Sequence, residues 1–136
     1  MRTIPEIQEV MTAVPQCIEF DRPLREARSL FRDLNIRHLP VTSGERFVGV
    51  LSDRDLRVAE VIEERSKQVL TAGDACVTDA YVVEPDTSLD VVVREMSRGR
   101  YGSAIVASAG EVLGIFTTVD ACREFSDFLK GRSFSA

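Results

Sequence analysis

The residues of this chain best suited to binding a small polar molecule form one short motif that occurs twice. Gly49–Asp55 reads GVLSDRD, and Gly114–Asp120 reads GIFTTVD 65 residues later. Both copies have glycine, two apolar residues, a hydroxyl residue, two variable positions and aspartate. An aspartate carboxylate can accept two hydrogen bonds, for example from a pair of adjacent hydroxyl groups. The repeated motif therefore indicates two related binding sites.

Each motif lies where a predicted strand passes into a predicted helix, so that Ser52 and Thr117 mark the junctions. The first turn of a helix has backbone N–H groups without intrahelical partners and carries partial positive charge. We therefore expect two related clefts that accept anionic groups such as phosphate.

Phosphate binding in this acidic chain would need local basic side chains. The candidates are Arg37, His38 and Arg54 in the first copy, and Arg98 and Arg100 in the second. Thr12, near the first strand, is a further candidate for the first copy. Together with the motif residues, the predicted ligand-binding set is Thr12, Arg37, His38, Ser52, Arg54, Asp55, Arg100, Thr117 and Asp120.

A purely structural interpretation of the same residues is also available. Ser52-x-x-Asp55 and Thr117-x-x-Asp120 fit the capping box, in which the hydroxyl is the N-cap and the acid at N3 bonds back to it. Such a box stabilises a helix without any ligand, and the two roles can coexist. His38 could equally be a hydrogen-bonded residue at a strand end, and we expect the arginines of the first helix to form a solvated face.

The elements that must position these residues follow one plan in both copies, β-α-β-β-α, which predicts an α/β (α+β) fold. In the first copy we expect a helical lead-in over 1–11, Asp21 as a helix cap, a turn at 43–45 and a helix after Ser52. In the second, Asp86 is the corresponding cap, and Ala109 and Gly110 form the hairpin turn. The side chains expected to face inward from the helices are Leu24, Ala27, Phe31 and Leu34 with Leu30 beside them, Leu56, Ala59 and Ile62 with Val58 as a further candidate, and Ala121, Phe125 and Phe128 or Leu129.

The ungapped repeat sets the domain organisation. We expect a first repeat with an N-terminal helical arm over 1–66, a linker over 67–74, and a second repeat with a C-terminal tail over 75–136. Self-similarity at a fixed period indicates two supersecondary units that cannot bury their apolar faces alone.

The bulk composition excludes several classes of protein. With 136 residues, 44% of them hydrophobic and 29% charged, the chain is typical of a globular protein. Its net charge of −5 argues against a general nucleic-acid or anionic-membrane binder. No apolar run approaches the ~20 residues of a membrane span, and Glu6 and Glu9 lie where a signal peptide would be apolar. We therefore expect a cytoplasmic protein.

Cysteine and histidine are too few and too scattered for a metal centre. Cys17, Cys76 and Cys122 are far apart, and His38 is the single histidine. No spacing matches a zinc site, and small buried thiols in a reducing compartment are the expectation.

These residues together resemble a tandem pair of cystathionine-β-synthase (CBS) domains, the arrangement called a Bateman module, over about residues 7–130. The resemblance rests on EVMT at Glu9–Thr12, DRPLREA at Asp21–Ala27, RHLPV at Arg37–Val41, and the two motifs themselves. It implies two repeats packed sheet against sheet about a pseudo-two-fold axis, with clefts between them for adenine nucleotides or related adenosyl ligands.

The resemblance also implies residue roles and a mode of action. Asp55 and Asp120 would bind ribose hydroxyls, and Ser52 and Thr117 would contact ribose or phosphate. Such pairs usually form homodimers and regulate an attached or partner protein without catalysis. The second copy departs from the pattern, because it has Gly102 and Ser103 where the first has Arg37 and His38. We therefore expect the two clefts to differ.

These features are compatible with three functions. The leading one is a non-enzymatic regulatory module that needs no cofactor and senses AMP, ADP, ATP or S-adenosylmethionine. The alternative is a ligand-free dimerisation or docking scaffold. An enzyme using Asp53, Asp55 and Asp120 is disfavoured, because the sequence offers no nucleophile–base set, no metal-ligand cluster and no Walker-type loop.

Overall fold

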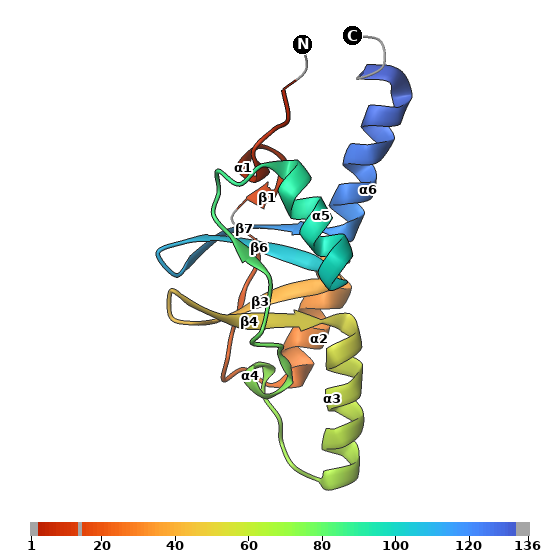
Figure 1. The fold of residues 1–136 in the computed structure, drawn as a ribbon. Helices are drawn as coiled ribbons and strands as arrows, with labels where there is room; N and C mark the ends of the chain where they lie inside the picture. Colours follow the sequence, from red (N-terminus) through yellow and green to blue (C-terminus); the bar gives the residue numbers. More distant parts are fainter. Residues whose placement is uncertain (1–2, 14, 133–136) are drawn as a thin grey trace. The chain divides into compact units, whose positions relative to one another are not determined.

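The computed structural model describes residues 3–13 and 15–132 of the chain, and Figure 1 shows a mixed α/β protein with two sheets. The chain divides into two compact units. The Asp55 unit comprises Gln16–Ala80 and Gly110–Val112. The Asp120 unit comprises the described part of Met1–Pro15, Tyr81–Ala109 and Leu113–Ala136.

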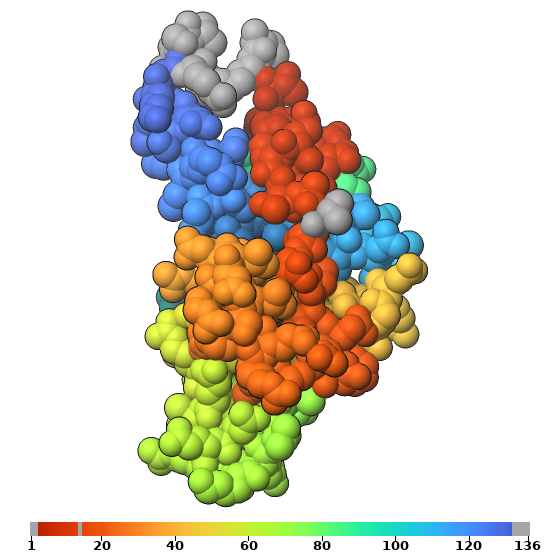
Figure 2. Space-filling model, turned by 180° about the vertical axis from the view of Figure 1, so that it is seen from behind, coloured from red at the N-terminus to blue at the C-terminus, as the bar shows by residue number. Residues whose placement is uncertain are grey.

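The Asp55 unit contains one three-stranded sheet in the order β2-β3-β4. Strand β2 is parallel to β3, and β3 is antiparallel to β4. The backbone N–H groups of Ala72 and Gly73 donate hydrogen bonds to the carbonyls of Arg22 and Phe20, so the start of α4 lies against the segment before α2. In Figure 2 the orange surface of the α2 region accordingly adjoins the yellow-green surface of the chain before α4. The elements of this unit are β2 (Ile18–Glu19), α2 (Leu24–Leu34), β3 (His38–Ser43), β4 (Arg46–Ser52), α3 (Asp53–Ser66) and α4 (Ala72–Ala75).

The Asp120 unit contains a four-stranded sheet in the order β1-β7-β6-β5. Its elements are α1 (Ile7–Val10), β1 (Thr12–Ala13), β5 (Val82–Val83), α5 (Leu89–Gly99), β6 (Ser103–Ser108), β7 (Glu111–Thr117), α6 (Thr118–Asp127) and the π-helical segment η1 (Phe128–Arg132). The predicted order β-α-β-β-α is confirmed in both copies, as β2-α2-β3-β4-α3 and β5-α5-β6-β7-α6. The predicted hairpin turns are also confirmed, since Gly44, Ala109 and Gly110 all have positive φ.

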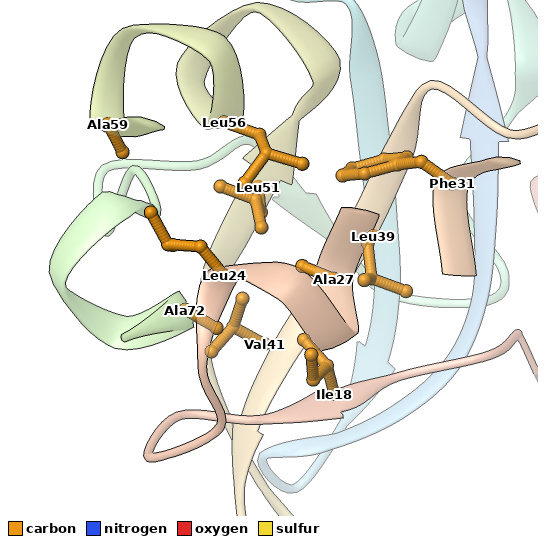
Figure 3. Close-up of a cluster of buried hydrophobic side chains, with 10 residues drawn as sticks. All are labelled: Ile18, Leu24, Ala27, Phe31, Leu39, Val41, Leu51, Leu56, Ala59 and Ala72. Carbon is orange, nitrogen blue, oxygen red and sulfur yellow. The ribbon is translucent and has the colours of Figure 1, made fainter. Parts of the chain in front are cut away.

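The core of the Asp55 unit is built from side chains that recur at helical spacing on α2 and at alternate positions on the sheet. Leu24, Ala27 and Phe31 are buried at i, i+3 and i+7 of α2. Figure 3 shows them directed toward Leu39, Val41 and Leu51 of the sheet and Leu56 and Ala59 of α3. The first turns of α3 are therefore fixed by apolar packing directly behind Ser52.

The segment that leads into each repeat packs on the motif strand of the other repeat. Strand β1, from the start of the chain, pairs antiparallel with β7, where Thr12 lies opposite Ile115. In the Asp55 unit, Val77 takes the same place beside Val50, with N–H···O distances of 2.8 and 3.0 Å in the two directions. The leading segment of each repeat along the chain therefore packs in the unit that holds the motif strand of the other repeat.

The motif glycines make this interleaving possible. A Cβ placed on Gly49 would lie 2.5 Å from the carbonyl oxygen of Val77, and one on Gly114 would lie 2.8 Å from that of Thr12. Real Cβ atoms do not come so close to a backbone oxygen, so any larger residue would force the added segment away from the strand. Glycine is therefore required at this motif position by packing, independently of any ligand.

The two predicted aspartate caps are wrong. Helix α2 has Pro23 as its N-cap and α5 has Ser88, neither with a side-chain cap bond, so Asp21 and Asp86 lie outside the helices. The reason is that both N-caps are held in extended conformation by isolated bridges, Pro23 to Thr71 and Ser88 to Glu6. Helical geometry cannot begin before those bridges end.

Several side chains expected to face inward are exposed. Leu34, Ile62 and Phe125 are each between 46% and 61% exposed, so these predictions are wrong. Of the two alternatives Phe128 and Leu129, Leu129 is exposed and Phe128 is half-buried. The buried residues of α3 are Leu56 and Ala59, both in its first half. Beyond them the helix extends past the sheet that covers its start, as Figure 1 shows. Periodicity identified the apolar stripe but not the point where its covering ends.

Replacement of Gly49 by alanine tests the packing role of the motif glycine. We expect the variant to lose about 1–3 kcal/mol of unfolding free energy, because the new methyl group meets a backbone oxygen that cannot rotate away. Arg46→Ala, at an exposed position of the same strand, is the matched control and should change stability by less than about 0.5 kcal/mol. Chemical denaturation measures both, and equal stability of the two variants would show that the close approach is not required.

Candidate functional site

The first motif forms a compact corner between β4 and α3, which we call the first corner and define by His38, Ser52 and Asp55. His38 lies directly opposite Ser52 in the β3–β4 register. Ser52 is the N-cap of α3, and its Oγ accepts a hydrogen bond of 3.0 Å from the backbone N–H of Asp55. The sequence prediction that these three residues come together is therefore supported by the geometry.

The carboxylate of Asp55 is uncommitted at this corner. Within the part of the chain that the structure describes, no hydrogen bond or ion pair reaches its oxygens, although its side chain is only half-exposed. The capping box is thus half formed: the hydroxyl caps the helix, but the acid does not bond back. This carboxylate can accept hydrogen bonds from a bound hydroxyl pair.

The second motif forms the second corner, defined by Gly102, Thr117 and Asp120, and here the box is complete. The Asp120 N–H donates to Thr117 Oγ1 at 3.3 Å, and the Thr117 N–H donates to Asp120 Oδ2 at 2.9 Å. Asp120 is buried, and Arg123 Nη2 contacts its other oxygen at 2.9 Å. The capping interpretation therefore fully accounts for Asp120 but only partly for Asp55.

The predicted basic residues have different surroundings. Arg37 is largely exposed, and its Nη1 lies 3.7 Å from Asp53 Oδ2, so it reaches the first corner but has an internal partner there. Arg54 is exposed in the first turn of α3, while Arg100 is the exposed left-handed C-cap of α5. Arg98 pairs with Glu95 on α5. The structure therefore groups Arg37 and Arg54 with the first corner by position.

Thr12 does not lie with the other candidate residues of the first copy. It was expected beside the first copy, but it lies in β1 of the Asp120 unit, opposite Ile115 of the second motif. The physical reason is the interleaved packing of the leading segments, which a linear reading of the repeats does not reveal.

Asp53 organises the charges of the first corner, and sequence reasoning missed this role. Its side chain is 15% exposed and contacts three arginines: Arg57, Arg28 at 2.9 Å, and Arg37. Hydrogen bonds first from Arg57 and then from Arg28 hold its pKa below the ordinary range. Arg28, expected on a solvated face, instead joins α2 to α3 through Asp53 and Glu60. The only sequence signal was the i,i+4 spacing of Asp53 and Arg57.

The helix starts offer fewer free amides than expected. The Asp53 N–H donates to the Arg37 carbonyl at 2.9 Å, and the Thr118 N–H donates to the Gly102 carbonyl at 3.1 Å. The N–H groups of Asp55 and Asp120 are bonded to their cap hydroxyls. A phosphate at the first corner would therefore depend mainly on basic side chains, of which Arg37, His38 and Arg54 are the candidates.

The His38 side chain is partly buried, and the Asp55 carboxylate is the charge that acts on it. Burial lowers the pKa of the imidazole, and the charge of Asp55 opposes that effect. His38 is therefore neutral near pH 7 and sensitive to acid.

In the described ranges, 3–13 and 15–132, no three His, Cys, Asp or Glu side chains are grouped so that they could hold a metal ion. None of the helices there combines the length and apolar character that crossing a membrane requires. Cys17 and Cys76 are half-buried, but Cys122 is exposed, so the expectation of burial is wrong for that thiol.

Comparison with known proteins identifies the class. The CBS domain family profile matches residues 7–61 and 72–127, the two copies recognised above, and the chain belongs to the CBS domain family. It is 24% identical over 121 residues to hypoxic response protein 1 of Mycobacterium tuberculosis, across 88% of this chain and 85% of that protein. It is 27% identical over 115 residues to inosine-5′-monophosphate dehydrogenase of Thermoplasma acidophilum, but spans only 21% of that enzyme.

Solved structures confirm the fold. A protein assigned to acetoin utilization (AcuB) from Vibrio cholerae superposes with a TM-score of 0.86 at 23% identity, covering 98% of this chain and 99% of that one. CBSX2 in complex with AMP gives 0.79 at 24% identity over 91% and 98% of the two chains. The CBS domain pair of MJ0100, in complex with 5′-methylthioadenosine and S-adenosylmethionine, gives 0.80 at 20% identity over 92% and 98%. The predicted CBS-pair resemblance and α/β fold class are therefore confirmed.

The lowered pKa of His38 predicts that the free energy of unfolding decreases in acid. Between the ordinary histidine pKa of about 6.5 and the lower value of the folded state, the unfolded chain binds a proton that folded His38 does not. The unfolding free energy should therefore decrease as the pH falls below about 6.5, and His38→Gln should flatten this slope. Glu19 and Asp53 also have lowered pKa values, but they titrate at more acidic pH. Urea denaturation between pH 7.5 and pH 5 measures the slope, and an identical slope in the variant would contradict the prediction.

Proposed function

We propose that this chain is a non-enzymatic regulatory module that binds an adenosine-containing ligand at the first corner. The observation that carries the proposal is the uncommitted carboxylate of Asp55, held next to the Ser52 hydroxyl by the start of α3. Support for the ligand class comes from relatives of the same fold whose structures contain AMP or S-adenosylmethionine with 5′-methylthioadenosine.

The roles of the residues follow from their chemistry. The ribose diol donates two hydrogen bonds to the Asp55 carboxylate, as a vicinal diol fits a single carboxylate. The Ser52 hydroxyl, already an acceptor from the Asp55 N–H, has a proton left to donate to a ribose or phosphate oxygen. Arg37 and Arg54 supply positive charge for a phosphate, with His38 as a neutral donor. An S-adenosylmethionine ligand would use the same diol contacts without needing that charge.

The ligand acts by shifting a conformational equilibrium. It can do so only to the extent that its affinity differs between two arrangements of the protein. The regulated partner would be a separate protein in the cytoplasm or an attached domain. We propose no catalytic role for this corner, because Asp53 contacts three arginines and Asp55 is assigned to diol binding. The repeat boundaries at 66/67 and 74/75 are part of the same proposal.

A second function, dimerisation or docking without ligand, is favoured by exposed apolar side chains on the last helix of each repeat. They include Val61 and Ile62 on α3, Phe125 on α6 and Leu129 on η1, each more than 50% exposed. We propose that they are covered by a second copy of this chain, since a homodimer is compatible with either function.

Thermal melting tests the ligand proposal. With AMP, ADP, ATP or S-adenosylmethionine at about 100 times the dissociation constant, binding adds about 2.7 kcal/mol and raises the melting temperature by several degrees. Asp55→Asn should abolish the shift, because the amide cannot accept the diol in the same way. Asp79→Asn, at an exposed position of the same unit, is the control and should retain it. The absence of a shift with every ligand at millimolar concentration would rule out nucleotide sensing.

Light scattering coupled to size-exclusion chromatography tests the dimer. The wild-type chain should elute with the mass of two copies, and Val61→Glu with Ile62→Glu should convert it to the mass of one, because the buried carboxylates would lack partners. Val69→Glu, at a position 82% exposed, is the control. A wild-type monomer would reject dimerisation, and an intact dimer in the double variant would reject this face.

A further inference from the structure

We infer that Arg123 closes the second corner to diol ligands, so that the chain binds its ligand at the first corner alone. This inference rests on the proposed function and deepens it, because it names the residue that decides which of the two motifs is used. The two motifs look equivalent in sequence, yet their carboxylates differ in every contact.

The acceptor capacity of Asp120 is largely used within the protein. Its Oδ2 accepts from the Thr117 N–H at 2.9 Å and from Thr117 Oγ1 at 3.2 Å, while its Oδ1 accepts from Arg123 Nη2 at 2.9 Å. A carboxylate has about four lone-pair positions, so three donors leave too few for both hydroxyls of a diol. The side chain is also only 10% exposed, which restricts approach from solvent.

The first corner has no such closure. The residue 65 positions before Arg123 is Val58, which occupies the same place on α3 relative to Asp55. Valine offers no donor, so Asp55 keeps both oxygens. Val58 is 53% exposed, which leaves room for a longer side chain at that position.

The arginines near the first corner form ion pairs with Asp53 and not with Asp55. Arg28, Arg37 and Arg57 all contact Asp53, and Arg28 also binds Glu60. The position that corresponds to Asp53 in the second copy is Thr118, which has no charge. In the first repeat Asp53 therefore pairs with the arginines and Asp55 stays free. In the second repeat Asp120 is the only acid of the pair, and it both caps the helix and pairs with arginine.

The closure depends on two contacts acting together. An exposed i,i+3 ion pair is weak by itself, and the Arg123 side chain is 54% exposed. A ligand at Asp120 would have to displace the arginine from Oδ1 and disturb the capping box on Oδ2. Removal of Arg123 opens Oδ1 and leaves the cap in place, so the helix should still form.

Reciprocal exchange of the two residues tests the inference by isothermal titration calorimetry with AMP and with S-adenosylmethionine. The wild-type chain should bind one ligand per chain. Arg123→Val should add a second site that Asp120→Asn removes. Val58→Arg should weaken binding at the first corner by roughly tenfold to a hundredfold, the value of a charge-assisted hydrogen bond. Val69→Arg adds the same charge elsewhere in the unit, and Val58→Gln adds length without charge; both should bind as the wild type does.

The outcomes separate this inference from the proposed function. Two ligands per wild-type chain, or loss of binding in Asp120→Asn but not in Asp55→Asn, would overturn the inference and leave ligand sensing intact. One site in both wild type and Arg123→Val, with Val58→Arg binding normally, would show that Arg123 is not the closing residue. Absence of binding to every variant would overturn the proposed function and the inference together.

Discussion

The structure depends on a backbone pairing that only glycine permits. At Gly49 and Gly114, the strand of each motif receives the carbonyl of another segment at a distance that no side chain would allow. That pairing fixes the strand, the strand fixes the residue that caps the next helix, and the cap fixes the carboxylate one turn further on. The positions of Ser52 and Asp55, and of Thr117 and Asp120, follow from it. The chemistry of the corners is therefore set by a packing constraint that lies three residues before each cap and six before each aspartate.

Much of the fold could be predicted because local and periodic signals agreed. The apolar spacing of α2, the turn at Gly44 and the order of elements in both copies were all readable from the sequence. The cap positions were not, because Pro23 and Ser88 are held extended by bridges to Thr71 and Glu6, which are remote in sequence. Exposure of Leu34 and Phe125 was missed for a similar reason, since periodicity does not state how far the covering sheet extends.

The sequence identified the residues of the candidate site, but it did not predict which of their charged groups are paired with one another. The motif named Ser52, Asp55, Thr117 and Asp120, but it could not say which carboxylate is already bonded. That difference arises from Arg123 against Val58, a contrast visible once the repeats are aligned but meaningless until an i,i+3 contact is seen. The role of Asp53 required knowing that α2 packs beside α3, which brings Arg28 to it across 25 residues of sequence.

The interleaved leading segments have a consequence for the chain as a whole. Val77 belongs to the second repeat by sequence but completes the sheet edge beside Val50, and β1 does the same for β7. Half of this polypeptide, cut between the copies, would therefore keep a motif strand with its outer N–H and C=O groups bare and lose the piece that covers them. Such a half could restore the missing hydrogen bonds only by exchanging its leading segment with that of an identical half, as in domain swapping. Covalent linkage of the two repeats makes that pairing intramolecular, which removes the dependence on a second chain.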